Sequence, residues 1–180
     1  PGLARLLPGG LPRGELVELT AGRSSGRFAC TPMLLAAATS AGENAALIDL
    51  GDGLDPQSAT QVGIVWPRLL WARPRAVREA LAATEAALTG GLPLVVLDLG
   101  LPPLPGGRGA EAMWVRLARS ARQHDALLLV ASPYRVAGPA ASTVLELTRG
   151  HARWSGAGTA PRLLEGADGR LTLTKAHRLL

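Results

Sequence analysis

Residues 15–30 constrain the fold of this chain more than any other stretch, because they pass from an apolar strand through a glycine- and serine-rich turn into a helix. They read Glu-Leu-Val-Glu-Leu-Thr-Ala-Gly-Arg-Ser-Ser-Gly-Arg-Phe-Ala-Cys. A phosphate-binding loop has the pattern G-x-x-x-x-G-K-[ST] at the same strand-to-helix junction. Here Ala21 stands for the first glycine, Arg27 for the lysine and Phe28 for the magnesium-binding hydroxyl residue. The layout of a nucleotide-binding loop is therefore present without the groups that act on the nucleotide.

The length and composition of the chain limit the class of protein to which it can belong. At 180 residues it fits a single domain with a full core. Hydrophobic residues make up 47% of the chain and aromatic residues only 3%, so the core must consist mainly of Leu, Ala and Val. The formal net charge is +5, from eighteen Arg and one Lys against 14 acidic residues. This imbalance reflects codon bias more readily than nucleic-acid binding, so the charge supports an anionic partner only weakly.

The sequence disfavours several other classes of protein. Cys30 is the single cysteine, so an internal disulfide and a cysteine-based metal cluster are ruled out. His124, His151 and His177 are far apart and have no carboxylate spacing typical of a metal site. No apolar run approaches the roughly 18 to 20 residues that cross a bilayer, and no signal-peptide pattern is present. We therefore expect an intracellular protein without a metal, a cofactor or a membrane anchor.

Strand and helix signals alternate along the chain, which predicts an α/β fold with a parallel sheet and right-handed crossovers. The predicted strands are Leu16–Thr20, Ala45–Leu50, Leu69–Trp71, Leu94–Leu99 and Leu127–Ala131, and the predicted helices are Phe28–Ala41, Arg75–Leu88 and Ala110–His124. Gly166-Ala167-Asp168-Gly169 is a hairpin signal, so we expect residues 162–175 to form a C-terminal antiparallel hairpin. Residues 1–180 are expected to form a single domain, with residues 1–13 leading into the first strand.

Motifs between about residue 9 and residue 175 resemble the ATPase core of the RecA recombinase family in order and spacing. They are Gly9-Gly10-Leu11-Pro12-Arg13-Gly14 before the first strand, Ser24-Ser25-Gly26 in the loop, Ile48-Asp49 with Leu54-Asp55-Pro56, Val62-Gly63-Ile64 with Leu69-Leu70, and Leu94-Val95-Val96-Leu97-Asp98. The last of these fills the family's Walker B strand. The resemblance implies a RecA-like three-layer αβα core with a mostly parallel, twisted sheet.

Three active-site roles of that family lack their residues in this chain. In the family, the loop lysine reaches the β and γ phosphates and the next hydroxyl holds magnesium, where this chain has Arg27 and Phe28. Phe28 is either a plug in the phosphate pocket or a helix residue turned to the core. The resemblance places the catalytic glutamate at Gly51 and the phosphate-sensing glutamine at Pro133, and neither residue has the required group. We therefore expect no catalytic residue and no ATP hydrolysis.

Passive anion binding does not depend on the lost groups, because it uses backbone amides and a helix N-terminus. Weak binding of phosphate or sulfate is therefore an open alternative. The degenerate anion-binding loop consists of Gly22, Ser24, Ser25, Gly26, Arg27 and Phe28. Asp98 is either a Walker B relic or a strand-end carboxylate that caps nearby backbone. We favour the cap, because a hydroxyl partner for a metal is missing.

Candidate contacts to DNA or to a protein lie outside the loop. Two arginines occupy the intervals that correspond to the family's DNA-contacting loops, three more repeat along one helix, and two tryptophans stand in turn contexts. In that order they are Arg108 and Arg135; Arg116, Arg119 and Arg122; and Trp66 and Trp154. Solvated arginines and tryptophans packed at the rim of the domain are the simpler interpretation, because no aromatic residues are interleaved with the arginines. Any DNA binding is expected to be weak.

A RecA-like domain without hydrolysis suggests a role in contacts rather than in chemistry. Among small bacterial RecA relatives with a decayed ATP site, the chain looks most like ImuA, and a SulA-type cell-division inhibitor is the second choice. The first resemblance implies a cytoplasmic or nucleoid-associated factor of SOS-induced translesion mutagenesis that binds RecA or an ImuB-like inactive Y-family polymerase. Two alternatives come from other functional classes. One is a residual ATPase, and the other is a nucleic-acid-binding module that uses the helix face formed by Arg116, Arg119 and Arg122.

Overall fold

The structure is a computed structural model that describes residues 6–7, 9–22, 25–100, 110–156 and 162–176. Its strands are β1 (Leu16–Ala21), β2 (Ala45–Asp49), β3 (Leu69–Ala72), β4 (Leu94–Asp98), β5 (Leu127–Ser132), β6 (Thr143–Ser155) and β7 (Leu163–Lys175). Its helices are α2 (Arg27–Ser40), α3 (Pro56–Gln61), α4 (Val77–Thr89) and α5 (Ala110–Gln123), with 3₁₀ turns at Trp66–Arg68 and Gly138–Ala140.

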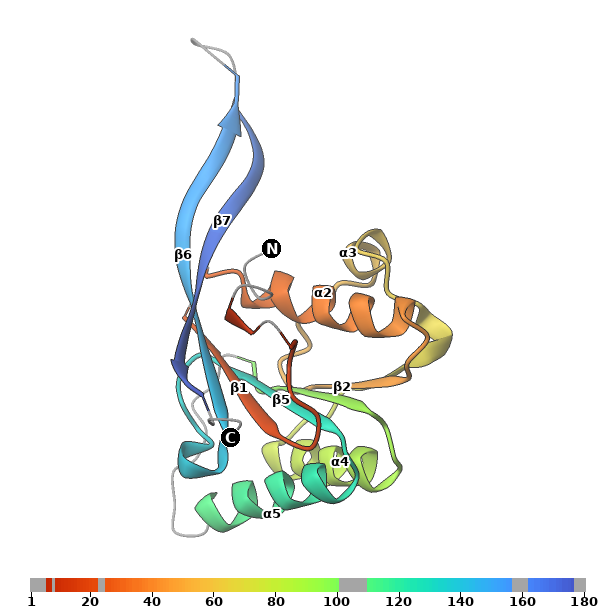
Figure 1. Cartoon of the computed structure of the whole chain (residues 1–180). Coiled ribbons are helices and arrows are strands. Elements are labelled where there is room, and N and C mark those ends of the chain that lie inside the picture. Colours follow the sequence, from red (N-terminus) through yellow and green to blue (C-terminus); the bar gives the residue numbers. More distant parts are fainter. Residues whose placement is uncertain (1–5, 8, 23–24, 101–109, 157–161, 177–180) are drawn as a thin grey trace.

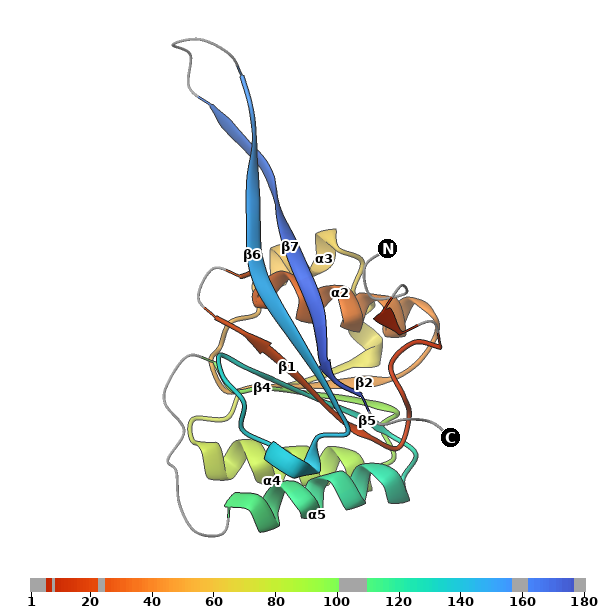
Figure 2. The ribbon, with the colours of Figure 1, turned by 60° about the vertical axis from the view of Figure 1, so that its left-hand side comes forward.

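The strands form a seven-stranded sheet in the order β3-β2-β4-β5-β1-β6-β7. Neighbouring strands from β3 to β6 run parallel, and β6 and β7 run antiparallel. Helices α2 and α3 cover one face of the sheet, and α4 and α5 cover the other (Figures 1 and 2). The predicted α/β fold with three layers and a mostly parallel sheet is therefore confirmed.

The central strands are buried because helices cover both of their faces. Every residue of β1, β2, β4 and β5 is buried, whereas the edge strand β3 is partly exposed. The apolar side chains form one core on each face of the sheet, with Trp114 and Leu117 of α5 in one and Leu35 of α2 in the other. Among the helices of the described ranges, none is both long and apolar enough to cross a bilayer.

The C-terminal part of the sheet corrects the predicted hairpin at residues 162–175. The residues from Leu163 to Lys175 form the single strand β7, which pairs with β6 from Ser155 back to Val144. Gly166–Gly169 lies inside β7 and is not a turn, because a long partner strand supplies the ladder hydrogen bonds that a short hairpin would lack. The antiparallel hairpin is thus β6–β7, and it projects well beyond the rest of the molecule (Figures 1 and 2).

Irregular register bends this long hairpin. The pairing of β6 with β7 shifts between Arg149 and Ala152 and again between Arg153 and Trp154, as in β-bulges. At Gly150 a Cβ would lie 2.5 Å from the carbonyl oxygen of Asp168, so only glycine fits there. Trp154 therefore lies in a bulged strand rather than in the turn that we predicted.

A buried carboxylate in the middle of β1 holds the segment that follows β5. Glu18 is fully buried, and its Oε1 accepts hydrogen bonds from the backbone amides of Val136 and, at 3.1 Å, Ala137. The Nε of Arg135 lies 3.9 Å from Oε2 of the same carboxylate. Because Ala137 is the N-cap of the 3₁₀ turn at Gly138–Ala140, Glu18 fixes the path of the chain from β5 to β6.

Replacing Glu18 with Ala should destabilise the protein strongly, because the amides of Val136 and Ala137 would lose their acceptor. Two orphaned amides predict a decrease of about 3 kcal/mol in the free energy of unfolding, measured by urea denaturation. Glu18→Gln keeps one carbonyl acceptor and should lower the free energy of unfolding by less. Glu146→Ala, at an exposed glutamate of β6, is the matched control and should be nearly neutral. Equal losses at the two glutamates would contradict this role for Glu18.

Candidate functional site

The degenerate loop connects β1 to α2 at the carboxyl edge of the parallel strands, where α/β folds place their ligands. Gly26 is the N-cap of α2 with φ of 94°, a left-handed conformation that favours glycine. The Ser25 hydroxyl donates to the carbonyl of Gly22 at 2.5 Å, so this serine supports the loop itself. Ser24 and the side chain of Phe28 lie outside the described part, so the choice between plug and core residue for Phe28 stays open.

Arg27, at the position of the family's loop lysine, points into the protein. Its side chain is only 2% exposed. Nη2 donates to the carbonyl oxygen of Gly100 at 2.8 Å, and Nη1 lies 3.4 Å from Oδ1 of Asp98. The amide of Gly100 in turn donates to the same Asp98 oxygen at 2.9 Å. Arg27, Asp98 and Gly100 thus form a closed ring of polar contacts at the ends of α2 and β4, which we call the arginine ring.

The electrostatics of the arginine ring centre on Asp98. Burial raises the pKa of Asp98 above its ordinary value, while the charge of Arg27 and the amide of Gly100 pull that pKa back down. The guanidinium of Arg27 therefore supplies the positive charge beside this strand-end carboxylate. The preferred interpretation of Asp98 as a backbone cap remains a prediction, and its contact with Gly100 agrees with it.

A second strand-end carboxylate, Asp49, organises the loop after β2. Its oxygens accept from the amides of Gly53 at 2.9 Å and Leu54 at 3.0 Å, and from the indole Nε1 of Trp71 at 3.3 Å. The space between Asp49 and Asp98 measures about 10 Å³. Such a cavity holds one water molecule at most, so it has no room for a phosphate group.

Gly51, where the resemblance places the catalytic glutamate, is closed in by backbone. A Cβ on Gly51 would lie 2.7 Å from Cα of Gly100, a separation that real Cβ atoms essentially never show. Gly100 is the residue whose carbonyl Arg27 binds. The loop after β2 and the end of β4 are therefore packed together where a catalytic side chain would need to stand.

On the side toward β6, the loop borders a cavity of about 300 Å³. The lining of this cavity includes Gly22, Ser25, Pro133, Arg149 and the acidic Glu146. This volume can hold a phosphate-sized anion, and Arg149 is the cation that borders it. Binding of phosphate or sulfate at the loop remains a prediction.

The other predicted contact residues are scattered over the molecule. Arg116, Arg119 and Arg122 are exposed on α5, and Arg116 pairs with Glu85 of α4 at 3.1 Å. Arg135 sits beside Glu18, and Arg108 lies outside the described residues. Arg116 and Arg135 therefore each lie beside a carboxylate of the domain.

The two predicted tryptophan anchors have different surroundings. Trp66 is partly buried, its ring centroid lies 6.2 Å from that of Trp71, and its Nε1 donates to the hydroxyl of Thr60 at 3.0 Å. It therefore packs within the domain, which was the simpler interpretation. Trp154 is 52% exposed. Within the described ranges, no group of three or more potential metal-ligating side chains is close enough to hold an ion.

Sequence reasoning missed Glu18 and the role of Asp49. The signal for Glu18 was present, since a carboxylate in the apolar run Leu-Val-Glu-Leu must find buried donors. The contact between Gly51 and Gly100 had no local signal, because it joins loops from two different strands.

The sheet, its two helical layers and the β1–α2 loop define a nucleotide-binding type of α/β protein. The sequence profile of the RecA N-terminal domain matches residues 4–103, which is more than half of the chain. The chain belongs to the RecA N-terminal domain family. The resemblance seen in the motifs is thereby confirmed at the level of the family.

Two curated relatives support this assignment. The chain is 33% identical over 91 residues to the protein RecA of Rickettsia canadensis and 36% identical over 91 residues to that of Methylococcus capsulatus. Each match covers 50% of this chain and 26% of the relative. The chain is thus matched to about a quarter of the length of these RecA proteins.

Replacing Arg27 with Met should cost about 3 kcal/mol of unfolding free energy at pH 7, because it leaves the Asp98 carboxylate buried without its cation. Without Arg27 the pKa of Asp98 rises further above its unfolded value. The native state then holds a proton that the unfolded state has lost, so stability decreases as pH rises above about 4. The deficit relative to wild type should therefore be smaller near pH 4 than at pH 7, measured by denaturant titration at both values.

Two further variants complete the test of the arginine ring. Arg27→Met combined with Asp98→Asn removes the buried charge and should recover part of the loss. Arg73→Met, which removes the cation of the exposed pair with Asp52, should change stability little. A loss at Arg27 that is independent of pH and is not relieved by Asp98→Asn would show that lost packing alone explains it.

Proposed function

We propose that this chain is a non-catalytic RecA-like interaction domain that acts in SOS-induced tolerance of DNA damage in the bacterial cytoplasm. Its partners in this proposal are RecA, an inactive Y-family polymerase of the ImuB type, or both. The role matches that of ImuA, the group that the chain most resembles among small RecA relatives with a decayed ATP site. Membership of the RecA N-terminal domain family supports a role close to RecA.

The observation that carries the non-catalytic part of the proposal is the arginine ring. A hydrolytic site needs its loop cation directed at the phosphates and its Walker B carboxylate available to the metal. Here Arg27 and Asp98 are both buried and face each other. Opening the site for magnesium and ATP would require breaking this buried pair, which is costly unless new partners replace it.

The second support is the geometry at the position of the missing general base. Gly51 lies against the backbone of Gly100, so restoring a glutamate there requires the two loops to separate. Pro133, at the sensor position, has no side-chain donor. Arg27, Gly51 and Pro133, at the positions of the loop cation, the general base and the sensor, each argue against hydrolysis.

Purified protein should release no phosphate from magnesium ATP above the level without protein, with or without single-stranded DNA. The RecA of the same organism serves as the active control in the same assay. The reason is that cation, base and sensor are each absent or turned inward. Phosphate release that is lost in an Arg27→Ala variant would overturn the proposal and favour a residual ATPase.

The interaction itself is tested by co-purification of the tagged full chain with purified RecA and, separately, with the inactive polymerase. We expect at least one stable complex, measured by size-exclusion chromatography at physiological salt. Absence of both complexes would contradict the proposal. Cell filamentation on overproduction, without these complexes, would favour the SulA-type alternative. DNA affinity that falls steeply with salt would favour a nucleic-acid-binding module.

A further inference from the structure

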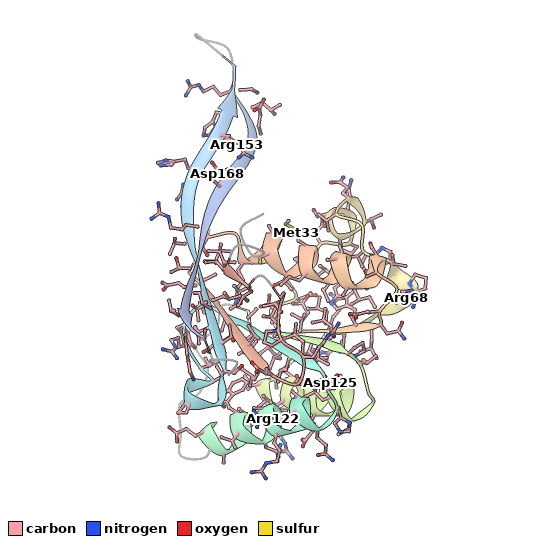
Figure 3. All side chains as sticks on the ribbon, viewed as in Figure 1. Met33, Arg68, Arg122, Asp125, Arg153 and Asp168 are labelled. Atoms are coloured by element: carbon pink, nitrogen blue, oxygen red, sulfur yellow. The ribbon has the colours of Figure 1, made fainter. Side chains whose placement is uncertain are left out.

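A groove of about 990 Å³ separates the N-terminal half of α2 from the β6–β7 hairpin. Its floor and walls come from Gly22 and Ser25–Arg27 of the loop, from one side of α2 and from the face of the hairpin that looks toward α2. Figure 3 shows Met33 on α2, with Arg153 and Asp168 on the hairpin across from it. The projecting hairpin therefore makes this groove, which the body of the domain alone would lack.

The groove is lined mainly by apolar groups that include two of the most exposed large side chains of the described part. Met33 on α2 is 61% exposed and Trp154 on β6 is 52% exposed. Leu147 and Leu171, which also pack against the core on this face, continue the apolar lining toward the sheet. Exposed apolar side chains gathered in one groove are typical of a protein contact site.

The bulge at Gly150 directs the tryptophan into the groove. Before the bulge, Leu145 and Leu147 face the α2 side of the sheet. Alternation alone would send Trp154 to the opposite face, because it is an odd number of residues away from Leu147. The extra residue at the register shift between Arg149 and Ala152 restores its direction, and Trp154 lines the groove.

The charge of the groove favours a negative occupant. Helix α2 carries no acidic side chain. The described outer part of the hairpin, residues 149–156 and 162–170, contains four arginines against Glu165 and Asp168. Arg149, Arg153 and Asp168 all line the groove, and Arg153 pairs with Asp168, so Arg149 carries the excess positive charge of its hairpin side.

We propose that this groove binds an acidic amphipathic segment of a partner protein. An apolar anchor of the segment would lie between Met33 and Trp154, and a carboxylate of the segment would pair with Arg149. The inference names the contact surface for the partner in the proposed function, and it rests on that function being one of interaction. Binding here leaves the arginine ring closed.

A second copy of the chain fits the groove less well. Four of the other exposed large apolar residues of the described part have an arginine within two residues in the sequence. They are Leu70 near Arg68, Val115 beside Arg116, Tyr134 beside Arg135 and Leu163 beside Arg162, whereas Val62 and Val65 have none so close. Each of these four would bring positive charge to a groove that already has an excess of it. An acidic partner therefore complements the groove better than the chain itself does.

The experiment is selection of a random peptide-display library on the full chain, with counter-selection on a Met33→Asp, Trp154→Asp double variant. We expect the enriched peptides to carry a net negative charge and at least one large apolar residue. Fluorescence anisotropy of one such peptide should show affinity weakened by about tenfold or more in either single variant. Arg149→Glu should weaken the acidic peptide as well, through charge alone.

Val115→Asp is the matched control, because Val115 is also an exposed apolar residue on a helix and lies on α5. It should leave peptide affinity unchanged. The proposal would be overturned if no peptide is enriched or if the enriched peptides lack negative charge. It would also be overturned if Met33→Asp changes the sedimentation of the chain alone, because that result would assign the groove to a second copy. RecA or polymerase binding that survives in the double variant would refute the groove and leave the proposed function standing. Peptide binding in the groove, together with failure to form a complex with RecA or with the polymerase, would support the groove and refute the proposed function.

Discussion

The buried contact between Arg27 and Asp98 is the interaction on which the rest of the site depends. A guanidinium at the start of α2 neutralises the carboxylate at the end of β4, and the carbonyl of Gly100 takes a further hydrogen bond from it. This contact lets the loops after β2 and β4 approach until Gly51 meets Gly100. In the family's ATPases, a metal ion supplies positive charge at this edge and a nucleotide fills the space. Here the side chain of one residue supplies the charge, and backbone fills the space.

The same sheet carries a second feature that is independent of the strand-end chemistry. The long β6–β7 hairpin leaves the sheet beside the degenerate loop and turns an otherwise flat edge into a groove against α2. Its bulges, made feasible by Gly150, decide which side chains face that groove. The groove thus combines residues of the β1–α2 loop, of α2 and of the hairpin into one shaped, charged surface.

Much of the α/β core was predictable because local signals and tertiary packing agree there. Apolar runs such as Leu94–Asp98 form strands, since helices cover both of their faces. The helix α3 had a readable start that we did not use, because Asp55 caps it and Pro56 opens it. The Gly166–Gly169 segment misled us, because its turn chemistry was overridden by pairing with a long partner strand. A segment with turn-forming residues can therefore form a strand when a long partner strand offers it a ladder of hydrogen bonds.

By itself the sequence determined the family and the alternation of strands and helices in the core, and it has Arg27, Phe28, Gly51 and Pro133 where the resemblance expects a loop lysine, a magnesium hydroxyl, a general base and a sensor glutamine. These follow from residue identity and spacing along the chain. Only the tertiary structure decided that Arg27 turns inward to Asp98, that Gly51 and Gly100 close on each other, and that Met33 and Trp154 line the same groove. The reason is that each of these contacts joins segments far apart in the sequence, whose approach depends on the packing of the whole sheet.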